Sequence, residues 1–406
     1  MARSIDAYNL LSAEAMANPF PLYDRLRRES PVHWSETLQV WILSRYGDVV
    51  AALRDARLSS DRMEPFVTHQ LRSLDVSLVA DFLRIANGTM LTKDVPQHAR
   101  LRKMASESFT RRALEAFRPV VQKVVDALLD RVQAHHAMEL VADFAQPLPA
   151  IVMAEMFGIP AQDREHFQRW SDDTARFFGG TFGDIAEDAC RANNGARHLE
   201  DYFLQLMSLR RREPGSDLMT LLLANQEQGR WDAHELSAQC VLILAAGHVT
   251  TIDQIGNGVH ALLTHPDQLR RLRARPALIH AAVEEVLRYA SSVPFIHRVA
   301  REDLEMRGQR IAQGQVVFLG LASANHDPAH FPDPDVFDIT RTPTRHLAFG
   351  HGAHLCLGAE LARRELEIGL RTLFDRFPGL QFAARPPELR HESLMFRGFK
   401  SMPLVF

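Results

Sequence analysis

The sequence predicts a mainly α-helical protein with a small β part. Apolar residues recur at helical spacing over long stretches of the 406 residues, whereas strand-like runs are few and short. No repeat, low-complexity tract or linker divides the chain. These three observations predict a single large domain over residues 1–406, with a minor β-rich part within about residues 30–60, 293–321 and 380–406.

The N-terminal part begins with a short amphipathic segment, PFPLYDRLRRES, that follows Asn18. Val32–Trp34 and Trp41–Ser44 are expected to form two short strands, and Tyr46–Arg54 a helix. From Leu58 to Thr92 the apolar residues follow no clear period. A long irregular stretch in a compact enzyme is often functional, so this one is expected to be a loop that faces the substrate.

Helical spacing then returns in six segments: Pro96–Phe109, Leu114–His135, Phe144–Phe157, Arg164–Phe178, Ile185–Arg212 and Leu218–Ala224. The longest pattern, from about Asp232 to Leu263, predicts a buried helix of roughly 50 Å at ~1.5 Å per residue. Gly247, Thr250 and Thr251 weaken its middle and predict a local opening there. The remaining elements are expected to be helices at Pro266–Arg273 and Pro276–Tyr289, strands at Val293–Val299 and Gln315–Leu321, and a final helix from about Gly358 to Phe377.

Composition and charge narrow the classes of function. The chain has 47 Lys+Arg and 50 Asp+Glu, a net charge of -3, which argues against a nucleic-acid binder with a basic surface. Its 46% hydrophobic residues exclude global disorder. Three cysteines cannot support a disulfide framework, so a soluble protein of the reducing cytoplasm is expected. No stretch gives an uninterrupted apolar run of ~18 residues, so no membrane anchor is expected.

Cys356 is the candidate with the most chemistry, because it lies in a glycine-rich loop just before the final helix. A thiolate there gains from the helix N-terminus and from backbone N–H groups of the loop. Cys190 and Cys240 stand alone on helical segments, which argues against a four-ligand zinc site. A single thiolate can be the axial ligand of a haem iron; the alternative for a lone Cys is a buried structural residue.

Residues 349–358 match Phe-Gly-x-Gly-x-His-x-Cys-x-Gly at every fixed position. This segment closely resembles the haem-binding loop of the cytochrome P-450 family, and the resemblance extends over nearly the whole chain. It implies the cytochrome P-450 fold, a single large helical domain around a buried haem b (iron protoporphyrin IX), with Cys356 as the metal ligand. Phe349 and Gly350 are then cofactor-binding residues beside the sulfur and the macrocycle.

Two charged motifs can be interpreted in the same way. His98 and Arg102 share one helix face at i, i+4 spacing, where they could bind an anion or belong to a solvated surface. The resemblance assigns both to the haem propionates, with Arg298 and His354 as further partners.

Glu285 and Arg288, at i, i+3 spacing, would by themselves be a surface ion pair of little energetic value. In the family this pair is buried and structural, with Arg341 as the expected third member.

Residues 246–251, Ala-Gly-His-Val-Thr-Thr, resemble the oxygen-activating helix of the family. Gly247 and Thr250 match its pattern, but Val249 stands where the family has an acid that helps to relay protons. The resemblance makes Thr250, Gly247 and His248 the catalytic candidates, with Thr250 central. His248 titrates near neutrality and could replace the missing relay, or it could simply pack in the core.

The resemblance implies a haem-thiolate monooxygenase that oxidises a small organic substrate with dioxygen and two electrons, in specialised-metabolite biosynthesis. The substrate could be bound to a carrier protein. The alternatives are a peroxygenase, a non-hydroxylating oxidase that couples or desaturates, and a haem-based sensor. The substrate pocket is expected among Leu58–Thr92, Phe177–Phe182, Leu242–Val249, Val293–Ile296 and Leu394–Phe396, where Arg62, His69 and Arg84 could meet an acidic substrate or merely be solvated.

No flavin or iron–sulfur motif is visible, so a separate electron donor is expected. The resemblance implies a ferredoxin or flavodoxin with its reductase. A basic docking patch near the cysteine is one interpretation, and scattered surface charge the other, for Arg100, Lys103, Arg111, Arg112, Arg363 and Arg364.

Overall fold

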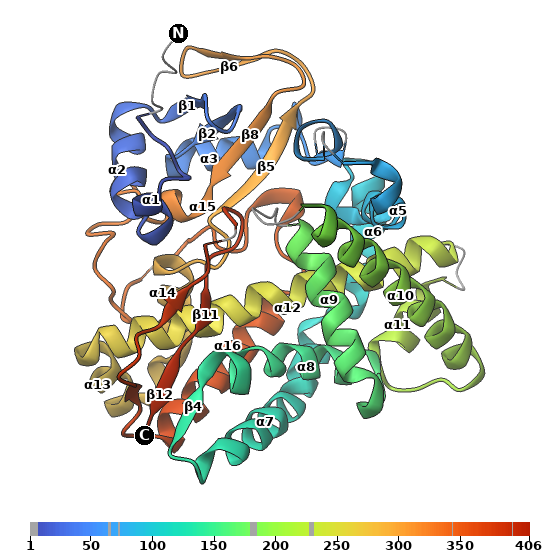
Figure 1. Ribbon diagram of the computed structural model, residues 1–406, viewed down its shortest axis with the longest axis vertical. Coiled ribbons are helices and arrows are strands. Elements are labelled where there is room, and N and C mark those ends of the chain that lie inside the picture. Colours follow the sequence, from blue (N-terminus) through green and yellow to red (C-terminus); the bar gives the residue numbers. More distant parts are fainter. Residues whose placement is uncertain are drawn as a thin grey trace.

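The computed structural model describes residues 7–63, 66–71, 74–178, 185–226, 231–342, 344–391 and 393–406. Figure 1 shows a body of helices crossed by one long helix, α12, with a small sheet at one end of the molecule. The helices are α1 Ala13–Ala17, α2 Phe20–Glu29, α3 Tyr46–Arg54, α5 Ala80–Gly88, α6 Gln97–Ser108, α7 Arg111–Gln133, α8 Pro147–Phe157, α9 Arg164–Phe178, α10 Ile185–Arg212, α11 Leu218–Gln226, α12 Ala233–Thr264, α13 Pro266–Ala274, α14 Ile279–Tyr289, α15 Leu321–Asn325 and α16 Ala359–Arg376.

Helix α12 is the central element of the fold. It begins at a capping box, in which the Asp232 carboxylate accepts from the amide of Glu235 at 2.7 Å and the Glu235 side chain accepts from the amide of Asp232. Helices α8, α9, α10, α14 and α16 all contact it. Among the described residues it is the one helix long and apolar enough to cross a membrane, and 72% of its most apolar window is buried inside the protein.

The predicted opening in the middle of this helix is not present, because α12 runs without interruption from Ala233 to Thr264. The hydroxyl of Thr250 donates to the carbonyl of Ala246 at 2.9 Å, a contact that a helix accommodates without breaking. Gly247 serves packing instead: a Cβ there would lie 3.2 Å from the Sδ of Met153 on α8.

The main sheet has the strand order β1-β2-β8-β5-β3. Its strands are β1 Val32–Ser35, β2 Val40–Leu43, β3 Leu58–Ser59, β5 Phe295–Ala300 and β8 Val316–Gly320. Only β2 and β8 run parallel, with Trp41 opposite Val317, and the other pairs are antiparallel. The remaining strands are β4 Ala137–Glu139, β6 Leu304–Met306, β7 Gln309–Ile311, β9 Gln381–Phe382, β10 Glu388–Leu389, β11 Phe399–Ser401 and β12 Pro403–Val405.

Strand β4 lies outside the expected β regions. It pairs with β12 near the C-terminus, and a three-residue strand with so distant a partner leaves no local pattern to detect.

The interpretation of Leu58–Thr92 as an irregular loop was wrong in part. Besides β3, the described residues of this stretch form a π-helical turn at Phe66–Gln70, 3-10 turns at Val76–Val79 and Met90–Thr92, and helix α5. Helix α5 buries Phe82, Ile85 and Ala86, which follow i, i+3, i+4 spacing over too few residues to stand out in the sequence.

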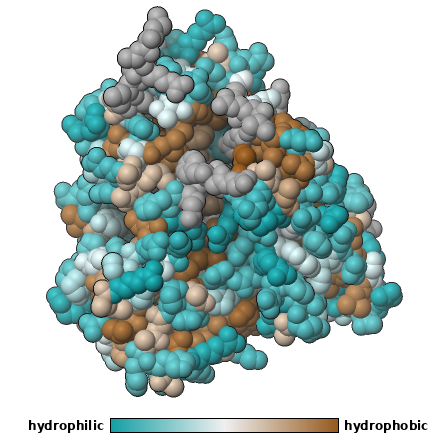
Figure 2. Space-filling model, in the orientation of Figure 1, coloured by the Kyte–Doolittle hydropathy of each residue, from teal (hydrophilic) through white to brown (hydrophobic). Residues whose placement is uncertain are grey.

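The surface of the molecule is mostly hydrophilic on the face in Figure 2, where apolar side chains form scattered patches. The interior contains one large apolar cluster among the helices and two smaller ones around the main sheet. Leu355, the residue before Cys356, is 45% exposed because it borders an internal cavity.

Candidate active site

The loop that carries Cys356 is shaped by glycines. Gly350 and Gly352 have φ angles of 72° and 75°, a backbone region that strains other residues. At Gly352 a Cβ would also lie 3.0 Å from the carbonyl oxygen of Leu53. The amide of Cys356 donates to the carbonyl of Phe349 at 2.9 Å and closes the loop, which holds the cysteine just before α16.

Cys356 faces a cavity of about 310 Å³ between its loop and α12. All but one of the ten residues proposed from the sequence line this cavity: Gly247, Thr250, His98, Arg102, Arg298, His354, Phe349, Gly350 and Cys356. A second cavity of about 200 Å³ shares Ala246 and Thr250 with the first and has mainly apolar walls. The structure therefore brings residues from four distant parts of the chain to one site.

The Cys356 thiol is exposed to this cavity rather than to bulk solvent. Burial raises its pKa, whereas a hydrogen bond from the backbone of Gly358 and the positive charges of Arg102 and Arg363 favour the thiolate. Cys240 is buried, and burial raises the pKa of its thiol. In the part of the chain that the structure describes, no three His, Cys, Asp or Glu residues come together as a metal site.

The four basic side chains expected from the sequence border the cavity beside Cys356. His98 and Arg102 come from α6, Arg298 from β5 and His354 from the cysteine loop. Burial lowers the pKa of His98 and Arg102, and lowers that of Arg298 to about 10. Burial and the positive groups around it lower the pKa of His354 to about 3. This part of the cavity is therefore electropositive and poorly solvated.

The residues present fit a haem with two propionates. The Nε2 atom of His98 is buried without a hydrogen-bond partner. Neither Arg102 nor Arg298 forms an ion pair with another described residue. The guanidinium of Arg298 donates a hydrogen bond to the carbonyl of its neighbour His297 at 2.9 Å. Buried donors without acceptors are costly unless a ligand supplies the acceptors, and the two propionate carboxylates of a haem would supply them.

Helix α12 presents Ala246, Gly247, Thr250 and Thr251 to the cavity, whereas His248 and Val249 between them do not line it. Val249 is 2% exposed and belongs to a small apolar cluster with Ala175 and Ala245, against which Phe396 packs, so no acid faces the cavity at this position.

His248 does not line the cavity either. Its buried ring lies 3.2 Å from Asp172 on α9, and burial lowers its pKa. The structure therefore places His248 in the packing between helices rather than with the other catalytic candidates.

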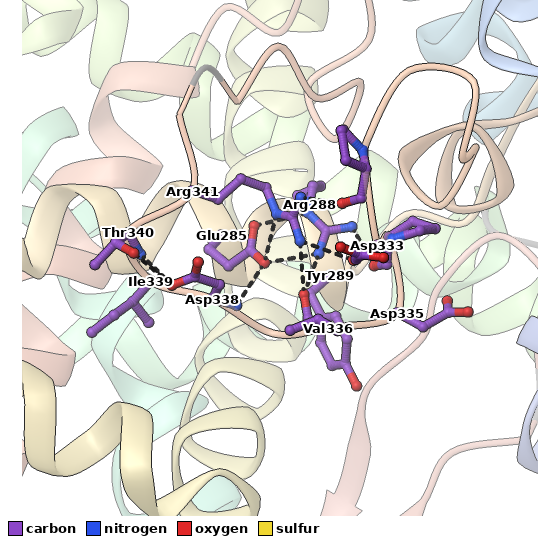
Figure 3. Close-up of polar contacts among 12 residues, drawn as sticks. Glu285, Arg288, Tyr289, Asp333, Asp335, Val336, Asp338, Ile339, Thr340 and Arg341 are labelled. Carbon is purple, nitrogen blue, oxygen red and sulfur yellow. Dashed lines mark hydrogen bonds and ion pairs between the residues drawn. The ribbon is translucent and has the colours of Figure 1, made fainter.

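Glu285, Arg288 and Arg341 form a buried network, which Figure 3 shows. Arg288 donates to both carboxylate oxygens of Glu285 at 2.8 Å, with neither side chain exposed, and Arg341 lies 3.3 Å from Glu285. Arg288 also donates to the carbonyl of Asn325, whose side-chain oxygen accepts from the amide of Leu347 at 2.7 Å. This network thus supports the chain just before the cysteine loop, a structural role.

Glu365 on α16 lines the cavity and was not recognised in the sequence. It is 2% exposed, one of its oxygens has no partner, and burial raises its pKa to about 8. The available signal was spacing, because Glu365 lies four residues after the buried Leu361 and next to the buried Leu366.

Of the expected pocket segments, 58–92, 242–249, 293–296 and 394–396 each contribute lining residues, whereas Phe177 lines neither cavity. Residues 179–182 and the side chain of His69 lie outside the described residues. Arg84 pairs with Glu200 and lines neither cavity, whereas Arg62 lines both.

The expected basic patch is partly neutralised by acids. Arg100 pairs with Glu235, Arg363 lies 2.7 Å from Glu284, and Arg364 lies 3.0 Å from Glu367. Lys103 and Arg112 are exposed, and the side chain of Arg111 lies outside the described residues.

Comparisons with known proteins identify the family of the chain. The family model for cytochrome P-450 matches residues 66–275 and 276–396. The chain belongs to the cytochrome P-450 family. It is therefore an oxidoreductase of the P-450 monooxygenase type, and its fold is the cytochrome P-450 fold around a haem cofactor. Enzymes of this type receive electrons from a redox partner.

Two curated relatives resemble it over nearly their whole length. The biotin biosynthesis cytochrome P-450 of Bacillus subtilis is 38% identical over 98% of this chain and 99% of its own. The cytochrome P-450 monooxygenase PikC of Streptomyces venezuelae is 37% identical over 97% of this chain and 92% of its own.

Solved structures agree with the fold in detail. P450BioI, in complex with an acyl carrier protein ligated to hexadec-9Z-enoic acid, has a TM-score of 0.89 and 38% identity over 97% of this chain and 100% of its own. CalO2 has a TM-score of 0.91 and 36% identity over 99% of both chains. Myxobacterial CYP267B1, in complex with myristic acid, has a TM-score of 0.86 and 38% identity over 98% of both chains.

Proposed function

We propose that this cytochrome P-450 binds haem b through Cys356 and inserts one oxygen atom into a small, mainly apolar metabolite. The observation that carries the proposal is the single thiol at a cavity whose lining includes the four basic groups expected from the sequence. His98, Arg102, Arg298 and His354 would hold the propionates, and Phe349 and Gly350 would border the macrocycle beside the sulfur. When bound, the haem supplies the oxidation, with dioxygen, two electrons and two protons.

The residues of α12 serve the chemistry on the other side of the cavity. Ala246 and Gly247 line the cavity with little or no side chain, and Gly247 also allows Met153 to pack closely against the helix. The hydroxyl of Thr250, which lines both cavities, can hold a proton at its Oγ1 atom and pass it into the site. Apolar walls exclude bulk water, which favours productive use of electrons. His248 has no part in this proposal.

The finer assignments rest on the chain's composition and on its relatives. The electron donor is a separate ferredoxin or flavodoxin with its reductase, and the enzyme works in the cytoplasm as a single domain. Relatives that are named for biotin and polyketide biosynthesis support a role in metabolite biosynthesis. The structure of P450BioI with an acyl carrier protein supports a carrier-bound substrate as one form.

Turnover assays test this proposal. The holoenzyme with NAD(P)H, a ferredoxin and its reductase should form an oxygenated product, and a pyridine haemochrome spectrum should identify haem b. The buried Val249 in place of an acid makes a peroxygenase the second candidate. Product formation with hydrogen peroxide but none with the electron-transfer chain would favour that candidate and overturn the first.

A further inference from the structure

Arg62 is the feature that the proposed function leaves without a role. It follows a segment that is fixed to the rest of the site. The amide of Ser60 donates to Asp94 at 2.9 Å, the Ser59 hydroxyl also donates to Asp94, and Arg301 lies 3.0 Å from the same carboxylate. The Ser60 hydroxyl lies 3.0 Å from Nε2 of His354. The chain therefore holds Arg62 at a defined place beside the cofactor site.

The guanidinium of Arg62 has no ion-pair partner among the described residues. Burial, together with the repulsion from another cation, Arg298, lowers the pKa of Arg62 to about 9. A pKa of that size still leaves Arg62 charged at neutral pH. An enclosed cation without a counter-charge is costly, which indicates that an anion normally completes the site.

The position of Arg62 distinguishes it from the four groups expected to hold the propionates. His98, Arg102, Arg298 and His354 border only the first cavity, whereas Arg62 also lines the second. The second cavity is otherwise walled by apolar and hydroxyl side chains and by His297, whose pKa lies well below its usual value because of burial and the adjacent Arg62 and Arg298. Arg62 is thus its one charged lining residue among those described.

The walls of the second cavity are suited to the apolar part of a ligand. Phe82, Ile85 and Val241 contribute to them, and Thr250 joins this cavity to the first. A ligand here would therefore have an apolar part between these walls, one end near the oxygen-activating helix and an anionic group against Arg62. A planar guanidinium matches a carboxylate with two parallel hydrogen bonds.

We propose that Arg62 binds the carboxylate of the substrate, so that the enzyme oxidises apolar molecules that carry a carboxylate group. This inference rests on the proposed function, because it names the substrate class of the same site. It makes Arg62 a specificity-determining residue that sets which end of the substrate lies away from the haem.

The test compares an acid with its uncharged ester. Dodecanoic acid and methyl dodecanoate are measured by equilibrium dialysis against the holoenzyme, R62Q and R62K. In the wild type the acid should bind at least about ten-fold more tightly than the ester, in R62Q this preference should vanish, and R62K should restore part of it. R57Q is the matched control, because Arg57 is exposed and pairs with Asp55 outside both cavities.

A different result would assign Arg62 to the haem. If R62Q loses haem while the ratio of acid to ester binding stays as in the wild type, the counter-anion is a propionate and the inference is overturned. Dialysis does not depend on the haem spectrum. A missing thiolate band in the wild type would therefore overturn the proposed function without obscuring the comparison of acid and ester. Because Arg62 has no ion-pair partner among the described residues, its replacement leaves no charge unpaired, and R62Q should keep the wild-type Tm.

Discussion

The imidazole ring of His98 lies against that of His354, with 3.8 Å between the ring centroids and 34° between their planes. One ring comes from α6 and the other from the cysteine loop, so the contact joins two segments far apart in the chain. Both rings have lowered pKa values, and the Nε2 atom of His98 has no partner. The pair is therefore placed to donate hydrogen bonds to an anion in the cavity.

The first prediction concerns retention of the cofactor. R298L and H98L should release haem at least about ten-fold faster than the wild type, because each removes a buried donor for a propionate. Haem transfer to a scavenger protein measures the rate. R310Q is the control, since Arg310 is 80% exposed on a distant hairpin. Equal rates in all four proteins would show that these side chains do not hold the haem.

The second prediction concerns the hydroxyl of Thr250. T250A should lower the amount of product per NAD(P)H consumed by about ten-fold or more, because no other described side-chain hydroxyl of α12 lines both cavities. T250S, which keeps the hydroxyl, should stay close to the wild type. The ratio of product to NAD(P)H is the readout, and unchanged coupling in T250A would contradict a proton role for this residue.

The third prediction concerns Val249, where the family has an acid. V249D places a carboxylate in the buried apolar cluster that contains Ala175 and Ala245, so it should cost about 2–4 kcal/mol of stability and bring no gain in coupling. V249A is the control for lost packing and should cost less. Urea unfolding of the holoenzymes measures both variants. Improved coupling in V249D with little loss of stability would mean that the carboxylate can reach the cavity.

The fourth prediction concerns Glu365, whose pKa is raised by burial to about 8. The folded state binds the Glu365 proton more tightly than the unfolded state does. This proton binding therefore stabilises the folded protein fully below the ordinary pKa of a glutamate side chain, and the stabilisation is lost as the pH rises toward about 8. E365Q removes this dependence. The free energy of unfolding of E365Q, relative to that of the wild type, should therefore rise by roughly 3 kcal/mol from about pH 5 to about pH 7.5.

Denaturant titrations at both pH values measure this gain. E367Q is the control on the same helix: Glu367 lies 3.0 Å from Arg364 and 2.8 Å from His280, so its loss should destabilise at either pH. A difference between E365Q and the wild type that does not grow with pH would contradict the burial of a neutral Glu365.

The parts that could be predicted from the sequence carry strong local patterns. The long apolar run predicted α12 to within a residue or two, and the glycines around Cys356 predicted a tight loop before a helix. The pairing of Glu285 with Arg288 and Arg341 followed from the family resemblance, and the structure confirms it. In each case spacing along the chain already defines the geometry.

The parts that could not be predicted depend on contacts across the fold. The spacing of His248 could not say that its ring faces Asp172 rather than the cavity. Whether Arg62 is solvated or enclosed depends on Asp94, which fixes its segment from thirty-odd residues away in the chain. The pairing of the expected basic patch with acids is likewise a tertiary property.

The central claim is that Cys356 is the thiolate ligand of the haem in this cavity. The most direct test is the absorption spectrum of the reduced, carbon monoxide-bound holoenzyme, recorded for the wild type and for C356H. The wild type should show the red-shifted Soret band that is characteristic of thiolate ligation, and C356H should bind haem but show the band of a histidine-ligated protein. A thiolate band that persists in C356H, or that is missing from a fully loaded wild type, would contradict the account.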